Sequence, residues 1–324
     1  MHTPMRSLAL AVLLGATVAH AQAPPAAAPA PPITEIVVEG QHQGPRMWVV
    51  RKGDHTLWIL GTLAPLPKKM VWQPDAVQEV LRQSQEVVPA WPSYGIGANP
   101  FTALRVYIEW RRLQKPPDRM PLREALPPVL YARVEALKSR YAPHDNKLEE
   151  MRPMMAAREL LTRVFDAAGL ALHNEVQQEV LTLARRQQVR VHQDKLRIDD
   201  PVNVLKDVGA TPLSGEVACL ASVVTLLESD LSVMQQRARA WALGDVAALR
   251  QLPLTDDRTA CVSAVSTSER VRTLITRAQD DWLLAVQDSL ERNKGTLAVQ
   301  SIDRLLGEHG ALATLKRSYS VEGP

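Results

Sequence analysis

The sequence of 324 residues predicts a mixed α/β (α+β) fold with a central β-sheet built from N- and C-terminal strands and a large helical middle section. Short runs rich in β-branched and aromatic residues occur near both ends of the chain. Between them, apolar residues recur at helical spacing. Hydrophobic residues make up 46 % of the chain and charged residues 23 %, which is typical of a globular protein and excludes a disordered one.

The first 32 residues are predicted to lie outside the folded domain. Arg6 precedes an apolar run of residues 7–18, and Ala19-His20-Ala21 matches the pattern that signal peptidase accepts. An amphipathic helix of the mature fold is the alternative, but the run has no polar face. We therefore expect a signal peptide over residues 1–21, cleaved after Ala21, and a periplasmic or secreted protein. Residues 22–32 read as an extended Pro/Ala linker, which leaves 33–324 as the domain.

The first strands are expected to form a hairpin. The runs at 46–51 and 56–60 flank residues 52–55, which include Gly53. A helix over 74–85 has a proline in its first turn. Residues 86–88 then predict a third strand that Pro89 stops.

The middle of the chain is predicted to be mostly helical. In residues 101–114, Leu104, Ile108 and Leu113 share one face. Residues 189–199 alternate apolar and polar side chains, as in a strand or a pair of short strands. The last strands are expected at 295–302 and 319–322. Further helices are predicted at 126–138, 151–167, 175–187, 215–243, 268–292 and 305–317.

Cys219 and Cys261 are the only cysteines. Export would make a disulfide available to them, and two buried free thiols are the alternative. A bridge over 42 positions would remove about 4 kcal/mol of unfolded-state freedom. We expect it to join the long helix that starts near Gly215 to a loop after Asp257.

Charge and motifs exclude several classes of function. Lys and Arg total 38 against 35 Asp and Glu, so the net charge is +3 and nucleic acid is not an expected partner. The sequence has no serine-hydrolase, zinc-protease, phosphate-loop or dinucleotide-binding motif. It indicates no cofactor and no particular partner. No segment after residue 18 is an apolar run of 18 residues, so we expect the mature chain not to span a membrane.

Two end segments carry a family resemblance. Residues 46–88 have a Trp-bearing strand, a turn, a strand that ends in Gly61-Thr62, a Pro-containing loop, a helix and a short strand. Residues 295–322 have a strand, a helix entry and a final strand, with Gly307, Gly310 and Tyr319 at the family's positions. Leu312, Leu315 and Val321 fit the same pattern. Together these segments resemble the TraB/GumN family, relatives of the TIKI proteases.

The resemblance also implies a metal site that this chain has lost. In active relatives, two histidines and a glutamate are thought to bind a divalent metal that activates water. Here Ala64 and Arg304 stand at the histidine positions, Ser301 replaces the associated glycine, and Ala90 replaces the glutamate. Methyl groups cannot coordinate a metal, and a guanidinium would repel it.

We therefore expect an exported, catalytically degenerate protein that acts by binding and holds no metal. Its cleft would be lined by Thr62, Trp91, Tyr94, Asp303 and Arg304. Arg304 would hold a carboxylate or phosphate, or would instead pair with Asp303 or Glu308.

Two other hypotheses remain. The chain could be a metal-dependent, protease-like hydrolase with a rearranged site made from Glu86, Asp303 and His309. It could instead be a structural or partner-binding periplasmic protein. The degenerate-site hypothesis makes a geometric prediction: strands 56–60 and 295–299 should be neighbours, so that Ala64, Ala90 and Arg304 gather at one edge of the sheet.

Overall fold

The computed structural model describes residues 44–90, 93–96, 99–143, 147–171, 174–193, 195–229, 232–252, 257–306 and 310–323. All of these belong to one compact unit, residues 31–324. The predicted signal peptide and the predicted linker lie outside the described residues.

A mixed six-stranded sheet has the strand order β10-β1-β2-β9-β4-β7. β1 and β2 form the predicted hairpin, with Gly53 in its two-residue turn at φ +59°, where glycine costs least. β10 pairs antiparallel with the outer side of β1, which brings the end of the chain beside its first strand. The six strands are β1 (Met47–Lys52), β2 (His55–Thr62), β4 (Glu86–Val88), β7 (Arg190–Val191), β9 (Gly295–Ser301) and β10 (Ser320–Glu322).

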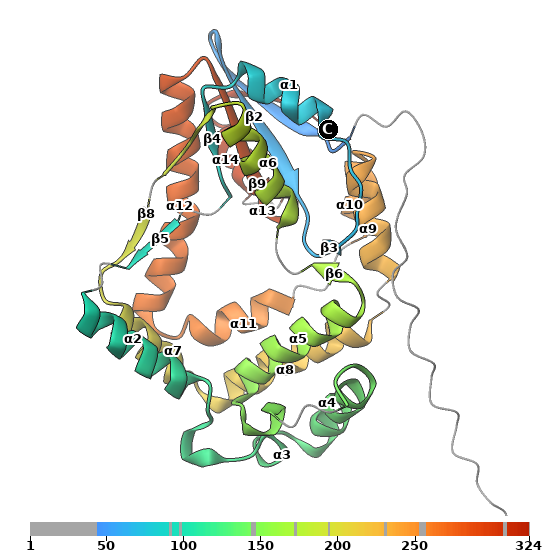
Figure 1. The fold of residues 1–324 in the computed structure, drawn as a ribbon, viewed down its shortest axis with the longest axis vertical. Coiled ribbons are helices and arrows are strands. Elements are labelled where there is room, and N and C mark those ends of the chain that lie inside the picture. The colour runs from blue at the N-terminus through green and yellow to red at the C-terminus, as the bar shows by residue number, and fades with distance from the viewer. Residues whose placement is uncertain are drawn as a thin grey trace, which may run out of the picture. The chain divides into compact units, whose positions relative to one another are not determined.

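β2, β9 and β4 run parallel in the middle of this sheet (Figure 1). Thr62 pairs with Ser301, and Val88 pairs with Ala298. Six of the seven residues of β9 are buried, as expected for a central strand covered on both faces. The prediction that segments 56–60 and 295–299 are neighbours in one sheet is confirmed.

Amphipathic helices cover the sheet. α1 (Asp75–Gln83) buries Val77, Val80 and Leu81 against it, and α6 (Glu175–Arg186) buries Val176, Val180 and Leu181. α9 (Ser232–Ala242), α10 (Val246–Gln251) and the long α12 (Glu269–Arg292) complete the same apolar core. The buried residues of segments far apart in sequence therefore close around the parallel strands.

A second apolar core is mostly helical. It is formed by α3 (Leu122–Ala125), α4 (Pro128–Tyr141), α5 (Pro153–Ala167) and α8 (Leu213–Glu228). Within it Arg152 and Glu216, both at most 3 % exposed, form a bidentate ion pair. The sulfur atoms of Cys219 and Cys261 are bonded at 1.98 Å. The bridge joins α8 to a helix, α11 (Asp257–Val265), and not to the loop that we expected.

Short elements connect these parts. Two two-stranded sheets pair β3 (Leu66–Pro67) with β6 (Leu170–Ala171) and β5 (Ser93–Ile96) with β8 (Lys195–Ile198). The remaining helices are α2 (Pro100–Leu113), η1 (Pro117–Arg119), η2 (Lys147–Glu150), α7 (Pro201–Gly209), α13 (Ile302–Leu306) and α14 (Ala311–Leu315).

Two helix predictions need correction. Residues 215–243 are not one helix, because Ser229 is extended and its N–H and hydroxyl bond to Leu226 O, which ends α8. The predicted helix 305–317 is replaced by the separate α13 and α14. In α2 only Leu113 is buried, whereas Leu104 and Ile108 are 57 % and 40 % exposed.

Among the described residues, no single helix is long and apolar enough to cross a membrane. Only α7 and α8 taken together have that length and composition, and they meet at 83°.

Candidate functional site at the carboxyl edge of the sheet

The three parallel strands end at the same edge of the sheet. Ala64 lies two residues after β2, Ala90 two residues after β4 and Arg304 three residues after β9. Ala90 is 2 % exposed, and Ala64 and Arg304 are half-buried. Ligands of open α/β sheets bind at such an edge, so these positions stand where a site is expected.

The first turn of α6 connects two of these strand ends. Asn174 caps α6 by accepting the N–H of Gln177 at 3.0 Å, and its Nδ2 donates to Thr62 Oγ1 at 2.8 Å. Gln177 Oε1 accepts the N–H of Ala90 at 2.8 Å. Thr62 is 1 % exposed and also donates to the backbone oxygen of Gln300. The predicted cleft residue Thr62 therefore has a structural role and does not face an open cleft.

A buried cation holds the carboxylate that follows β9. Arg237 of α9 is 2 % exposed, and its Nη2 lies 3.1 Å from Asp303 Oδ1. Nη1 of Arg237 donates to the backbone oxygens of Leu249 and Leu252. Its Nε atom is buried and has no hydrogen-bond partner among the described residues. Because half of the Asp303 side chain is exposed, this cation orients a carboxylate that solvent can reach.

Two tryptophans pack beside the end of β2. Trp241 of α9 is 1 % exposed, and its Nε1 donates to Gly61 O at 2.7 Å. The ring of Trp72 lies 5.7 Å from the Trp241 ring, tilted by 59°. Trp72 Nε1 donates to Glu179 of α6 at 2.7 Å. Both indoles thus have their polar atom satisfied, and the half-buried Trp72 offers an aromatic surface next to the edge.

A family model, described as the TraB/PrgY/gumN family, matches residues 46–322. The chain belongs to the TraB/PrgY/gumN family. The match extends from the first strand of the sheet to the last, and so includes all three parallel strands and the helices between them. No curated protein and no solved structure matches the chain.

The residues at this edge do not fit the divalent metal that the resemblance to active relatives implies. Among the described residues, no three His, Cys, Asp or Glu side chains are grouped so that they could hold a metal ion. Asp303 is a carboxylate, but it forms an ion pair with Arg237. In this TraB/PrgY/gumN protein the three positions after the strands carry two methyl groups and a guanidinium, none of which is a metal ligand.

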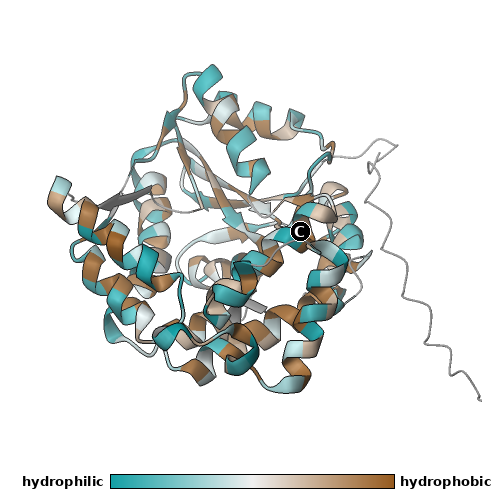
Figure 2. Ribbon diagram, turned by 60° about the horizontal axis from the view of Figure 1, so that its bottom comes forward, coloured by the Kyte–Doolittle hydropathy of each residue, from teal (hydrophilic) through white to brown (hydrophobic). Residues whose placement is uncertain are grey.

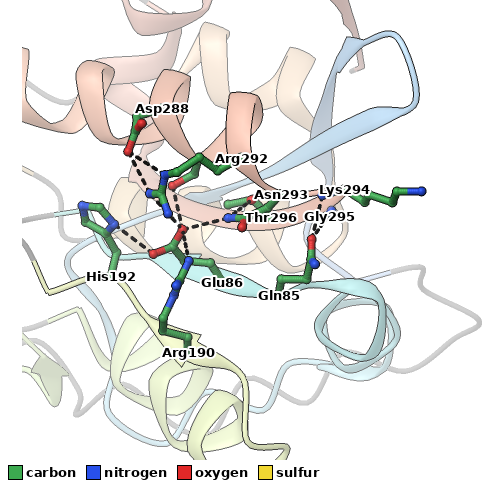
Figure 3. A network of polar contacts seen from close by, with 11 residues as sticks. Gln85, Glu86, Arg190, His192, Asp288, Arg292, Asn293, Lys294, Gly295 and Thr296 are labelled. Atoms are coloured by element: carbon green, nitrogen blue, oxygen red, sulfur yellow. Dashed lines mark hydrogen bonds and ion pairs between the residues drawn. The ribbon is translucent and has the colours of Figure 1, made fainter.

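A second polar cluster lies at the other end of the strands, around the first residue of β4 (Figure 3). Glu86 is 2 % exposed. Ser289 Oγ and Asn293 Nδ2 of the α12 end donate to its Oε2 at 2.9 and 2.8 Å, and His192 Nδ1 lies 3.0 Å from Oε1. Arg190 and Arg292 add ion pairs at 3.2 and 3.6 Å.

These partners decide the charge of Glu86. Burial by itself raises the pKa of its carboxyl group, but the hydrogen bonds from His192, Asn293 and Ser289 and the nearby charge of Arg190 outweigh burial and lower the pKa. Glu86 is therefore an ionised carboxylate that fastens α12 and the segment after β7 to the sheet. Such a buried network of hydrogen bonds and ion pairs around one carboxylate is typical of a structural role.

Glu86 and Asp303 do not share a site. Glu86 pairs with Thr296 near the start of β9, whereas Asp303 follows Ser301 at its end. The five residue steps from Thr296 to Ser301 span about 16 Å at the rise of a β-strand. The rearranged metal site proposed from the sequence is therefore not assembled by these two carboxylates, and its third member, His309, lies outside the described residues.

The other predicted cleft residues have different outcomes. Trp91 lies outside the described residues. Tyr94 is in β5, opposite Leu196 of β8, in a separate two-stranded sheet and not in the six-stranded one. Arg304 is half-buried and takes part in an interaction within the chain. Sequence reasoning missed Arg237, Gln177 and Trp241; Asn174 alone had a detectable signal, as the asparagine immediately before a predicted helix.

Proposed function

We propose that this member of the TraB/PrgY/gumN family is an exported protein that acts by binding rather than by hydrolysis. One observation carries the proposal. The positions that follow three adjacent parallel strands, Ala64, Ala90 and Arg304, hold side chains that cannot bind a metal. Hydrolysis of the kind attributed to active relatives needs neutral imidazoles and a carboxylate there.

Other features of the same edge support binding. Asp303 presents a half-exposed carboxylate fixed by the buried Arg237, and Trp72 presents an aromatic surface nearby. Arg304 has five N–H donors, so it can serve a partner within the chain and an anionic ligand together. A carboxylate or phosphate group is the ligand chemistry that this cation suits. The Cys219–Cys261 disulfide supports export, because such bonds persist in oxidising compartments.

Metal analysis tests the loss of hydrolytic chemistry. Native protein, purified without an affinity metal, is analysed by inductively coupled plasma mass spectrometry beside an Asp303→Ala variant. We expect no stoichiometric zinc, manganese or cobalt in either protein. One metal ion per chain that disappears in Asp303→Ala would overturn the proposal in favour of the hydrolase.

Ligand binding has its own test. Thermal unfolding is followed with inorganic phosphate or small carboxylates added to the native protein, to Arg304→Gln and to Arg250→Gln, a matched exposed arginine of α10. We expect the anions to raise the unfolding temperature of the native protein and of Arg250→Gln, and to raise that of Arg304→Gln less. Equal shifts in all three proteins would contradict the assignment of Arg304.

A further inference from the structure

α2 turns large apolar side chains toward solvent. Phe101, Leu104 and Tyr107 are 79 %, 57 % and 59 % exposed. Their spacing of three residues places them on one face of the helix. Figure 2, with α2 at its left, shows several brown segments along this helix, although it lies at the periphery of the domain. Single exposed apolar residues are common, but three large ones on two turns of one helix form a patch of the kind that marks an interaction surface.

Cations follow this patch along the helix. A groove of about 720 Å³ lies between α2, η1 and α7, with Ile108, Leu113 and Leu205 among its apolar lining. Four of its cations, Arg111, Lys115, Arg119 and Lys206, form no ion pair with any described residue. Glu109, the one carboxylate among the described residues that line the groove, already pairs with Arg112 at 2.9 Å.

The backbone at Arg119, which lines the groove, is strained. Asp118 and Arg119 have φ angles of +57° and +54°, in the left-handed region that residues other than glycine seldom adopt. Two consecutive residues of this kind hold the exposed Arg119 beside the cations of α2. Strain of this type is often kept where it positions a group for binding.

We propose that this face of α2 docks onto an anionic phospholipid bilayer. Phe101, Leu104 and Tyr107 enter the interfacial region, and Arg111 and Lys115 contact the phosphates of the headgroups. An apolar helix face next to unpaired Lys and Arg is the pattern of helices that lie on a membrane surface. Aromatic side chains favour that depth, and each cation gains energy from an anionic surface.

Charge argues against two other occupants. A two-fold contact between copies of this chain would bring these cations, which the described part of the chain does not pair, face to face. The Pro/Ala segment of residues 22–32 carries no charged side chain, so it cannot complement them. The complement required is an extended surface that is apolar inside and anionic outside.

Vesicle co-sedimentation of the full mature chain tests the proposal. One set of vesicles is phosphatidylcholine with about a third of phosphatidylglycerol, and the other is phosphatidylcholine alone. We expect binding to the anionic vesicles and much weaker binding to the neutral ones. Arg111→Gln with Lys115→Gln should lower the partition coefficient about 25-fold, at about fivefold per cation. Phe101→Ser with Leu104→Ser should lower it about 100-fold, at about tenfold per side chain.

Matched variants control for general surface effects. Leu284→Ser on α12, where the side chain is 61 % exposed, and Arg250→Gln on α10 should bind like the native chain. Circular dichroism checks that every variant is folded. Equal binding to neutral and anionic vesicles, or unchanged binding of the α2 variants, would overturn the proposal. A dimer in solution that the α2 variants dissolve, with no binding to vesicles, would assign the face to a second copy instead.

Discussion

Replacing Glu86 by alanine should destabilise the domain by about 3–4 kcal/mol. The change removes the Glu86 acceptor from Ser289 and Asn293, which are 0 % and 6 % exposed, and leaves Asn293 Nδ2 only its longer hydrogen bond to Thr296 Oγ1 at 3.3 Å. Each buried donor left unsatisfied costs about 1–3 kcal/mol, and the ion pairs to the more exposed Arg190 and Arg292 add less than about 1 kcal/mol each. Glu86→Gln keeps an acceptor oxygen and should cost about half as much.

The same residue should give the stability a recognisable pH dependence. The pKa of Glu86 is lowered in the folded state, so the carboxylate contributes its full stabilisation above the ordinary pKa of 4.5. That contribution is lost as the pH falls below 4.5 through the lowered folded-state pKa. The native protein should therefore lose more stability between pH 5 and pH 3 than either variant.

Urea unfolding followed by far-ultraviolet circular dichroism measures both effects. Glu79→Ala removes an exposed glutamate of the neighbouring α1 and serves as the control, with an expected change below about 1 kcal/mol. A Glu86→Ala variant as stable as Glu79→Ala, or one with the same acid sensitivity as the native protein, would refute the reasoning.

Three further predictions concern other parts of the domain. Reduction of the Cys219–Cys261 bridge should lower the free energy of unfolding by up to about 4 kcal/mol, and with it the unfolding temperature, while the domain stays folded. Differential scanning calorimetry with and without reductant measures the shift, and an unchanged unfolding temperature would show that the bridge is absent. Arg237→Ala should cost about 3 kcal/mol in urea, because backbone oxygens that accept from its guanidinium lose their donor, and a loss below about 1 kcal/mol would contradict the buried contacts. Burial and the hydrogen bond to Glu149 raise the pKa of Tyr131 to about 12, so ultraviolet titration should show a late-ionising tyrosine that is missing in Tyr131→Phe.

The strands of the sheet could be predicted because each one is encoded by residues within its own short segment. Strands 46–51 and 56–60 combine β-branched and aromatic residues with a glycine turn, and 86–88 and 295–302 are short apolar runs. The family resemblance then indicated that these segments meet, and the pairing of β2 with β9 agrees.

The polar contacts of the site could not be predicted in this way. The partners of Glu86 lie 104 to 207 positions away, and Arg237 is 66 positions from Asp303. No periodicity connects residues so far apart. The exposure of the α2 face could not be predicted for another reason: helical spacing places Leu104 and Ile108 on one face, but it does not say whether that face packs on the domain or stays exposed.

The central claim, that Ala64, Ala90 and Arg304 occupy a former metal site, is tested most directly by restoring its ligands. Zinc binding is measured by isothermal titration calorimetry on the triple variant Ala64→His, Ala90→Glu, Arg304→His and on each single variant. The account predicts zinc affinity in the triple variant and none in the single variants, because one added ligand cannot hold the ion. A folded triple variant that binds no zinc would contradict the account.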